Sequence, residues 1–120
     1  MASVLLAEDE FLIRAVLVDA LEGLGLACIE VANGQAALDV VAGDVALSAI
    51  IVDIGLPDMS GERVIEAAIR HRPQTPVIRC SGAPPSAPLP AGSKVHVVAK
   101  PYSVDALSKL VASLVANADG

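Results

Sequence analysis

The 120-residue sequence has almost no aromatic residues and few basic ones. Phe11 and Tyr102 are its only aromatic residues, at 2% of the chain, so stacking on nucleic-acid bases is disfavoured. The 14 Asp and Glu residues against 8 Lys and Arg residues give a formal net charge of −6, which offers no basic surface to a phosphate backbone. We therefore expect no direct binding to nucleic acid.

The sequence also lacks long hydrophobic runs and cysteines at the spacing of metal ligands. Charged residues interrupt the apolar N-terminal region before any run reaches the roughly 18 residues that suggest a membrane span. The first residues carry no positive segment typical of a signal peptide. Cys28 and Cys80 do not have the spacing of metal ligands. These absences predict a cytoplasmic protein that does not insert into a membrane.

Aliphatic residues are what the chain has in quantity. Hydrophobic residues make up 54% of the sequence and charged residues 18%. This balance excludes the disordered class, which is poor in apolar residues, and predicts a packed aliphatic core. The length suits a single domain that spans residues 1–120.

Short apolar runs alternate with amphipathic stretches along the sequence. The runs predict strands over residues 4–7, 27–31, 49–52, 76–80 and 95–99, the first of them buried. The amphipathic stretches predict helices over 11–24, from an Asn33 cap to about Gly43, from a Ser60 cap to Pro73, and over 104–116. Residues 83–92 hold four prolines. Each would cost about 3 kcal/mol inside a helix, so we expect no regular helix there.

This alternation predicts an α/β domain whose parallel strands are joined by right-handed crossovers, with helices on both faces of the sheet. Ligands of such folds bind beyond the C-terminal ends of the strands. Polar residues follow the predicted strand ends in this sequence, and they are Glu8, Asp9, Asp53, Ser81 and Lys100. We therefore expect these side chains to meet at one edge of the sheet.

Three carboxylates, a hydroxyl and an ammonium group suit a divalent cation and a phosphoryl group. Mg²⁺ takes about six oxygen ligands, and Asp9 and Asp53 can supply two of them. A carboxylate can also accept a phosphoryl group as a nucleophile, which gives an acyl phosphate. Lys100 and Ser81 can contact phosphate oxygens. Each residue alone also fits an ordinary solvated loop, so it is their grouping that favours function.

Four segments of the sequence carry these residues in order. They are Leu5-Leu6-Ala7-Glu8-Asp9-Glu10, residues 51–61 with the sequence IVDIGLPDMSG, Ser81-Gly82, and Lys100-Pro101-Tyr102. Together they resemble the receiver domain of two-component response regulators over essentially the whole chain. The resemblance implies a doubly wound, flavodoxin-like fold with a five-stranded parallel sheet in the order 2-1-3-4-5. It leaves no residues for an output domain, which implies a stand-alone, chemotaxis-regulator-like protein.

The resemblance also implies roles for the acidic residues. Asp53 matches the phosphoacceptor of the family. Glu8 and Asp9 match the acidic pair that places Mg²⁺, with Asp9 as a direct ligand and Glu8 acting through water. The backbone carbonyl of Gly55 matches a further metal ligand.

Ser81 matches the family's hydroxyl that follows the phosphoryl group, and Lys100 matches its phosphate-contacting lysine. The bond between Lys100 and Pro101 is commonly cis in the family, so we expect a cis bond here. Two features depart from the family pattern. Val97 stands where receivers usually have an aromatic switch residue, and the proline-rich segment 83–93 stands where they have a fourth helix, which we expect to be degenerate.

We expect a stand-alone receiver that accepts a phosphoryl group on Asp53 from a sensor histidine kinase or a histidine phosphotransfer protein. It would signal by contact with an unidentified downstream protein. We expect no enzyme activity besides self-catalysed phosphorylation and dephosphorylation of Asp53. Phe11 fits either a core position or a contact with the phosphodonor.

Other readings stay open at this point. The missing aromatic at Val97 leaves open a receiver-like adaptor that works without phosphorylation, although the retention of all five polar residues argues against it, because such an adaptor has no need to crowd like charges. An aspartate-nucleophile phosphatase of the haloacid-dehalogenase kind would normally have a second Asp where Gly55 stands. The sequence also leaves open whether the chain forms a weak homodimer.

Overall fold

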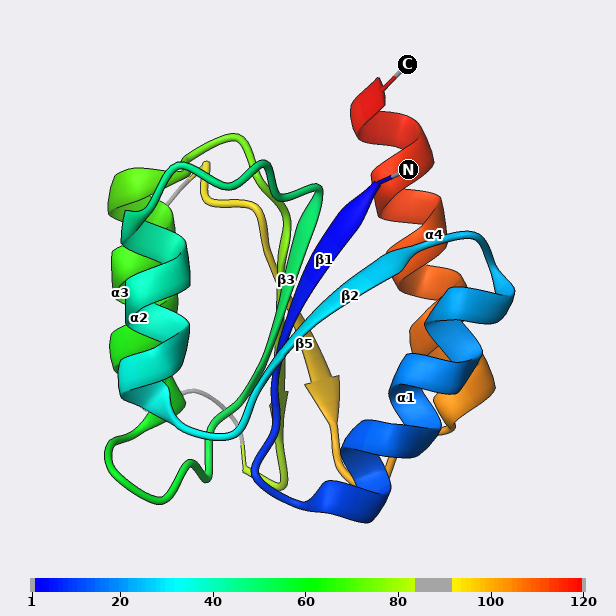
Figure 1. The fold of residues 1–120 in the computed structure, drawn as a ribbon, viewed down its shortest axis with the longest axis horizontal. Coiled ribbons are helices and arrows are strands. Elements are labelled where there is room, and N and C mark those ends of the chain that lie inside the picture. Colours follow the sequence, from blue (N-terminus) through cyan, green and yellow to red (C-terminus); the bar gives the residue numbers. More distant parts are fainter. Residues whose placement is uncertain (1, 84–91, 120) are drawn as a thin grey trace.

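A five-stranded parallel sheet lies between two pairs of helices in the computed structural model, which describes residues 2–83 and 92–119 (Figure 1). The strands are β1 (Ser3–Ala7), β2 (Ala27–Val31), β3 (Ala49–Asp53), β4 (Val77–Ser81) and β5 (Val95–Ala99). The helices are α1 (Phe11–Gly23), α2 (Gly34–Ala42), α3 (Gly61–His71) and α4 (Val104–Asp119). The strand order β2-β1-β3-β4-β5, with every neighbouring pair parallel, confirms the predicted flavodoxin-like fold.

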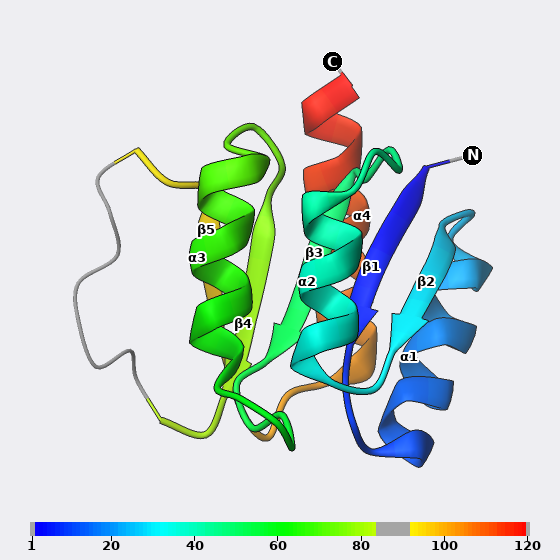
Figure 2. The ribbon, with the colours of Figure 1, turned by 60° about the vertical axis from the view of Figure 1, so that its left-hand side comes forward.

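The helices cover both faces of the sheet, as right-handed crossovers require. Helices α1 and α4 lie on one face, and α2 and α3 on the other (Figures 1 and 2). Each face has its own aliphatic core. Leu6, Leu17 and Ile51 are buried on the α1 and α4 side, whereas Leu5, Ile50 and Val64 are buried on the α2 and α3 side. Neighbouring residues of one strand therefore enter different cores, as the alternation of side chains along a strand requires.

Two helix starts follow from the capping residues that the sequence predicts. The Asn33 side chain accepts a hydrogen bond from the Ala36 N–H at 2.8 Å, and the Ser60 hydroxyl accepts one from the Glu62 N–H at 3.2 Å. Both caps satisfy amide groups that have no partner within the helix. They fix the first turns of α2 and α3 next to the C-terminal ends of the strands.

The apolar periodicity of α1 is only partly a core pattern. Leu17 and Leu21 are buried, but Leu12 is 76% exposed and Val16 52% exposed. These two residues lie on the side of α1 that lines an open groove. The first half of α1 therefore presents an apolar surface to solvent.

Three further expectations can be compared with the fold. The Lys100–Pro101 peptide bond is cis, as the family resemblance implies. The prediction that prolines exclude a fourth helix falls largely on residues 84–91, which lie outside the described residues. No helix in the described ranges is long and apolar enough to cross a membrane.

Candidate functional site

The register of the sheet brings the predicted polar residues to one edge. Strands β1 and β3 are aligned so that Glu8, the residue after β1, lies beside Asp53. Asp53 pairs with the residue before Ser81. Lys100 follows β5 directly after the residue that pairs with Ser81. We call Glu8, Asp9, Asp53, Ser81 and Lys100 the polar site.

Three carboxylates of the polar site form a compact cluster. Carboxylate oxygens of Glu8, Asp9 and Asp53 all lie within 4.8 Å of one another. Glu8 and Asp53 are buried, whereas Asp9 is exposed. Oxygen atoms this close together, with one side open to water, fit the ligand preference of Mg²⁺, which usually keeps several water ligands.

Lys100 balances part of this negative charge. Its Nζ lies 3.0 Å from Oδ1 of Asp53, and the Gly55 N–H donates a hydrogen bond to the same oxygen at 3.2 Å. Burial by itself lowers the pKa of Lys100, but the hydrogen bond and charge of Asp53 outweigh it, so the pKa is raised. Lys100 is therefore a fixed positive charge at neutral pH.

Glu8 is the acidic residue whose titration the site alters most clearly. Its pKa is raised from 4.5 to about 7, first because the carboxyl group is buried and further because of the negative charge of Asp53. The Glu10 N–H donates a hydrogen bond to Glu8 at 3.1 Å, which lowers the pKa and partly opposes the shift. Repulsion among the acids thus contributes less than burial does.

We predict that the metal-free protein loses stability as the pH rises from about 5 to about 8. The folded chain holds a proton on Glu8 up to about pH 7, whereas the unfolded chain releases it near pH 4.5. The folded state thus binds more protons in this window, and its free energy of unfolding falls by about 2 kcal/mol as Glu8 ionises. Chemical denaturation across the pH range, with and without Mg²⁺, measures this loss.

The matched control for this pH dependence is Glu8→Gln, which keeps the shape of the side chain without its titration. Its free energy of unfolding should vary less over the same window, and any remaining change reports the other titrating groups. Saturating Mg²⁺ should also flatten the wild-type curve, because the ion favours the ionised carboxylate. Equal pH slopes for the wild type and Glu8→Gln would contradict the assignment to Glu8.

Ser81 is the last residue of β4, and the backbone amides of two other residues hold it in place. Its hydroxyl oxygen accepts a hydrogen bond from the Ala83 N–H at 3.1 Å. Its carbonyl oxygen accepts one from the Lys100 N–H at 2.9 Å. The backbone therefore fixes Ser81 and Lys100 relative to each other.

Two supporting side chains were not apparent from the sequence. Arg14 donates to the Glu8 carbonyl oxygen at 2.8 Å and to the Glu30 carboxylate at 3.3 Å, which fixes the turn between β1 and α1. Asp58 accepts hydrogen bonds from the amides of Gly34 at 2.7 Å and Gln35 at 3.0 Å, which lower its pKa. Asp58 thereby attaches the loop after Asp53 to the first turn of α2.

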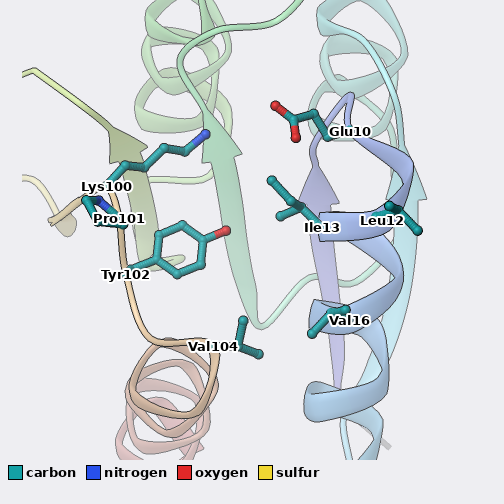
Figure 3. A pocket seen from close by; sticks show the side chains of 8 residues that line it. All are labelled: Glu10, Leu12, Ile13, Val16, Lys100, Pro101, Tyr102 and Val104. Atoms are coloured by element: carbon teal, nitrogen blue, oxygen red, sulfur yellow. The ribbon is translucent and has the colours of Figure 1, made fainter.

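An open, mostly apolar groove of about 590 Å³ adjoins the polar site (Figure 3). It lies between α1 and the segment that leads from β5 into α4. Its lining consists of Glu10, Leu12, Ile13, Val16, Lys100, Pro101, Tyr102 and Val104. The Tyr102 hydroxyl points across the groove toward α1 (Figure 3). At the start of α1, Phe11 is 69% exposed, so it is not a core residue.

Solved structures with the same fold include receiver domains from several organisms. A CheY-like receiver domain protein from Methanospirillum hungatei JF-1 is 22% identical, with a TM-score of 0.84 over 99% of this chain and 97% of that chain. A receiver protein from Sinorhizobium medicae WSM419 is 22% identical, with a TM-score of 0.84 over 98% and 96% of the two chains. These likenesses establish the fold.

A third solved structure is the receiver domain of the sensor histidine kinase PA1611 from Pseudomonas aeruginosa PAO1. It is 22% identical, with a TM-score of 0.76 over 96% of this chain and 98% of that chain. That structure has a magnesium ion coordinated in its active site cleft. No curated protein matches the sequence significantly.

The amino-acid sequence was also compared with models of protein families. The model of the response regulator receiver domain matches residues 4–112, which include every residue of the polar site. The match spans well over half of the 120 residues. The chain therefore belongs to the response regulator receiver domain family.

Proposed function

We propose that this chain is a receiver in which Asp53 accepts a phosphoryl group from a phosphohistidine on a sensor kinase or phosphotransfer protein. The observation that carries the proposal is the contact of 3.0 Å between Lys100 Nζ and Asp53 Oδ1 beside two further carboxylates. This arrangement places a nucleophile, a cation and metal-binding oxygens at one point. Membership of the receiver family supports the same function.

In the proposed reaction, an oxygen of Asp53 attacks phosphorus and the P–N bond of the phosphohistidine breaks as the new P–O bond forms. The product is an acyl phosphate, and the donor histidine takes the electron pair of the broken bond. Lys100 and Gly55 both contact Oδ1 of Asp53. These two contacts hold the carboxylate in one orientation. Positioning of the reacting groups, together with electrostatic stabilisation, is how proteins accelerate phosphoryl transfer.

Lys100 and Ser81 then face the charge that accumulates on the phosphoryl oxygens. The ammonium group of Lys100 already lies at the carboxylate, so no rearrangement of this group is needed before it acts. The Ser81 hydroxyl accepts a hydrogen bond from Ala83 and keeps its own hydrogen to donate. It can therefore donate to a phosphoryl oxygen without losing its present partner.

The residues that would hold Mg²⁺ are Glu8, Asp9 and Asp53, with the carbonyl oxygen of Gly55 as a further ligand. When bound, the ion supplies positive charge to the phosphoryl oxygens.

We also propose that hydrolysis of the acyl phosphate at the same site is the chain's only other chemistry. Both cysteines are free thiols, which agrees with a reducing compartment such as the cytoplasm.

We further propose that the phosphodonor contacts the groove beside Lys100. Phe11, Leu12 and Val16 expose apolar side chains on the first half of α1, and a large exposed apolar area commonly marks a protein interface. The groove opens next to the polar site, so a partner bound there would bring its phosphohistidine close to Asp53. The apolar lining suits the apolar face of an amphipathic helix of the donor.

The double variant Leu12→Asp with Val16→Asp tests the docking surface. We expect the rate of transfer from a phosphorylated histidine phosphotransfer protein to fall about 10-fold or more, because two charges would be buried at the interface. Phosphorylation by acetyl phosphate, which needs no docking, should stay unchanged. Rates of Asp53 phosphorylation from the two donors, measured side by side, separate docking from chemistry.

Val45→Asp is a suitable control, because Val45 is 42% exposed but lies in the loop between α2 and β3, away from the groove. It should leave both rates unchanged. An equal loss with both donors in the double variant would place the defect in the polar site or in folding. An unchanged rate from the protein donor would rule out the groove as its docking surface.

A further inference from the structure

Arg79 is a charged residue in the middle of a buried strand. It is only 3% exposed and lies in β4, two residues before Ser81. Its Nε donates to the Glu62 carboxylate at 2.7 Å, and its Nη1 donates to the Ala83 carbonyl oxygen at 3.1 Å. Burying an arginine is costly unless its donors are satisfied, and here the two partners come from separate elements. Arg79 thus connects β4, the first turn of α3 and the turn after Ser81.

The position of Arg79 in the sheet is informative as well. In the register of β4 and β5, Arg79 pairs with Val97. Paired residues of neighbouring strands project to the same face, so the two side chains are neighbours. Val97 is the position where the family resemblance leads one to expect an aromatic switch residue. In this chain, the neighbour of that position on β4 is Arg79, which is hydrogen-bonded to the turn that follows Ser81.

We propose that Arg79 is a positioning residue for Ser81, an inference that rests on the proposed phosphorylation of Asp53. By holding the Ala83 carbonyl, Arg79 fixes the turn whose Ala83 N–H is bonded to the Ser81 hydroxyl. Both bonds end on the same residue, so a shift of Ala83 changes the orientation of the hydroxyl. The guanidinium is held in turn by Glu62, whose carboxylate accepts the hydrogen bond of 2.7 Å from Arg79 Nε. Glu62 lies in the first turn of α3.

Arg79→Met is the direct test, since it keeps a long apolar stem and removes both donors. In the metal-free protein, we expect the Ala83 amide to exchange with solvent severalfold faster by NMR, with amides of β1 unchanged. With acetyl phosphate and Mg²⁺, we expect phosphorylation of Asp53 to slow severalfold. In the Ser81→Ala background, Arg79→Met should slow it no further, because its effect passes through the hydroxyl.

A second variant separates positioning from folding. Arg79→Lys keeps the charge but has one ammonium group, which cannot reproduce both guanidinium contacts, so it should slow phosphorylation to a smaller extent than Arg79→Met. The proposal is overturned by unchanged exchange at Ala83, or by an equal further loss of rate from Arg79→Met in the Ser81→Ala background. A wild-type chain that takes up no phosphoryl group would refute the proposed function, while the exchange rates would still decide whether Arg79 holds the turn.

Discussion

Replacing Lys100 with methionine should lower the rate of Asp53 phosphorylation about 100-fold, the usual scale for removing one group that stabilises developing charge. Lys100 Nζ lies 3.0 Å from Asp53 Oδ1. It is the positive group of the polar site, where the three carboxylates would otherwise repel an incoming phosphoryl group. The initial rate with acetyl phosphate at saturating Mg²⁺ measures the effect.

Lys109→Met provides a matched control for this substitution. Lys109 Nζ lies 3.0 Å from Asp105 Oδ2 on the exposed face of α4. The substitution therefore removes a positive charge, as Lys100→Met does, but outside the polar site. Such exposed pairs contribute little to stability, and the rate of phosphorylation should not change. A rate for Lys100→Met within threefold of the wild-type rate would contradict the role given to Lys100.

The substitution Gly61→Ala should destabilise the fold by about 3 kcal/mol, the upper end of the usual cost of overpacking. Gly61 begins α3 and lies against the end of β3, the strand that carries Asp53. An added Cβ would overlap the Asp53 carbonyl oxygen and lie 2.8 Å from the Ile54 Cα, and both are backbone atoms that cannot move separately. The end of β3 would have to shift, so phosphorylation should slow as well. Denaturant unfolding and the acetyl phosphate rate measure the two effects.

Gly23→Ala is the control for the steric effect of an added Cβ. Gly23 is the last residue of α1, and an added Cβ there would meet no described atom within 4 Å. Alanine favours helices over glycine, so this variant should be as stable as the wild type or up to about 1 kcal/mol more stable. If Gly61→Ala were equally well tolerated, the close approach of α3 to β3 would be wrong.

The positions of the strands and helices follow closely from local sequence. The mostly apolar stretch 27–31 becomes β2 with the same bounds, and the predicted caps Asn33 and Ser60 precede α2 and α3 directly. These features depend on periodicity and on hydrogen bonds between near neighbours, which the sequence displays directly. The strand ends then carry Glu8, Asp53 and Lys100 to one edge because the sheet is parallel.

Features that depend on distant residues were not predictable in this way. Periodicity along α1 does not distinguish a core side chain such as Leu17 from Leu12, which is exposed beside the groove. Asp58 caps α2 across 24 residues of sequence. Arg79 stands out as a charge within an apolar run, but its bonds to Glu62 and Ala83 depend on the packing of α3 on β4.

Mass spectrometry after incubation with acetyl phosphate and Mg²⁺ tests phosphorylation of Asp53 most directly. We predict that the wild-type chain gains the mass of one phosphoryl group, that chelation of Mg²⁺ prevents the gain, and that Asp53→Asn abolishes it. Asp39→Asn, an exposed acid on α2, should behave as the wild type. If the folded wild-type protein binds Mg²⁺ and gains no phosphoryl group, or if Asp53→Asn still gains one, the proposed function is wrong and an adaptor that works without phosphorylation of Asp53 becomes the better explanation.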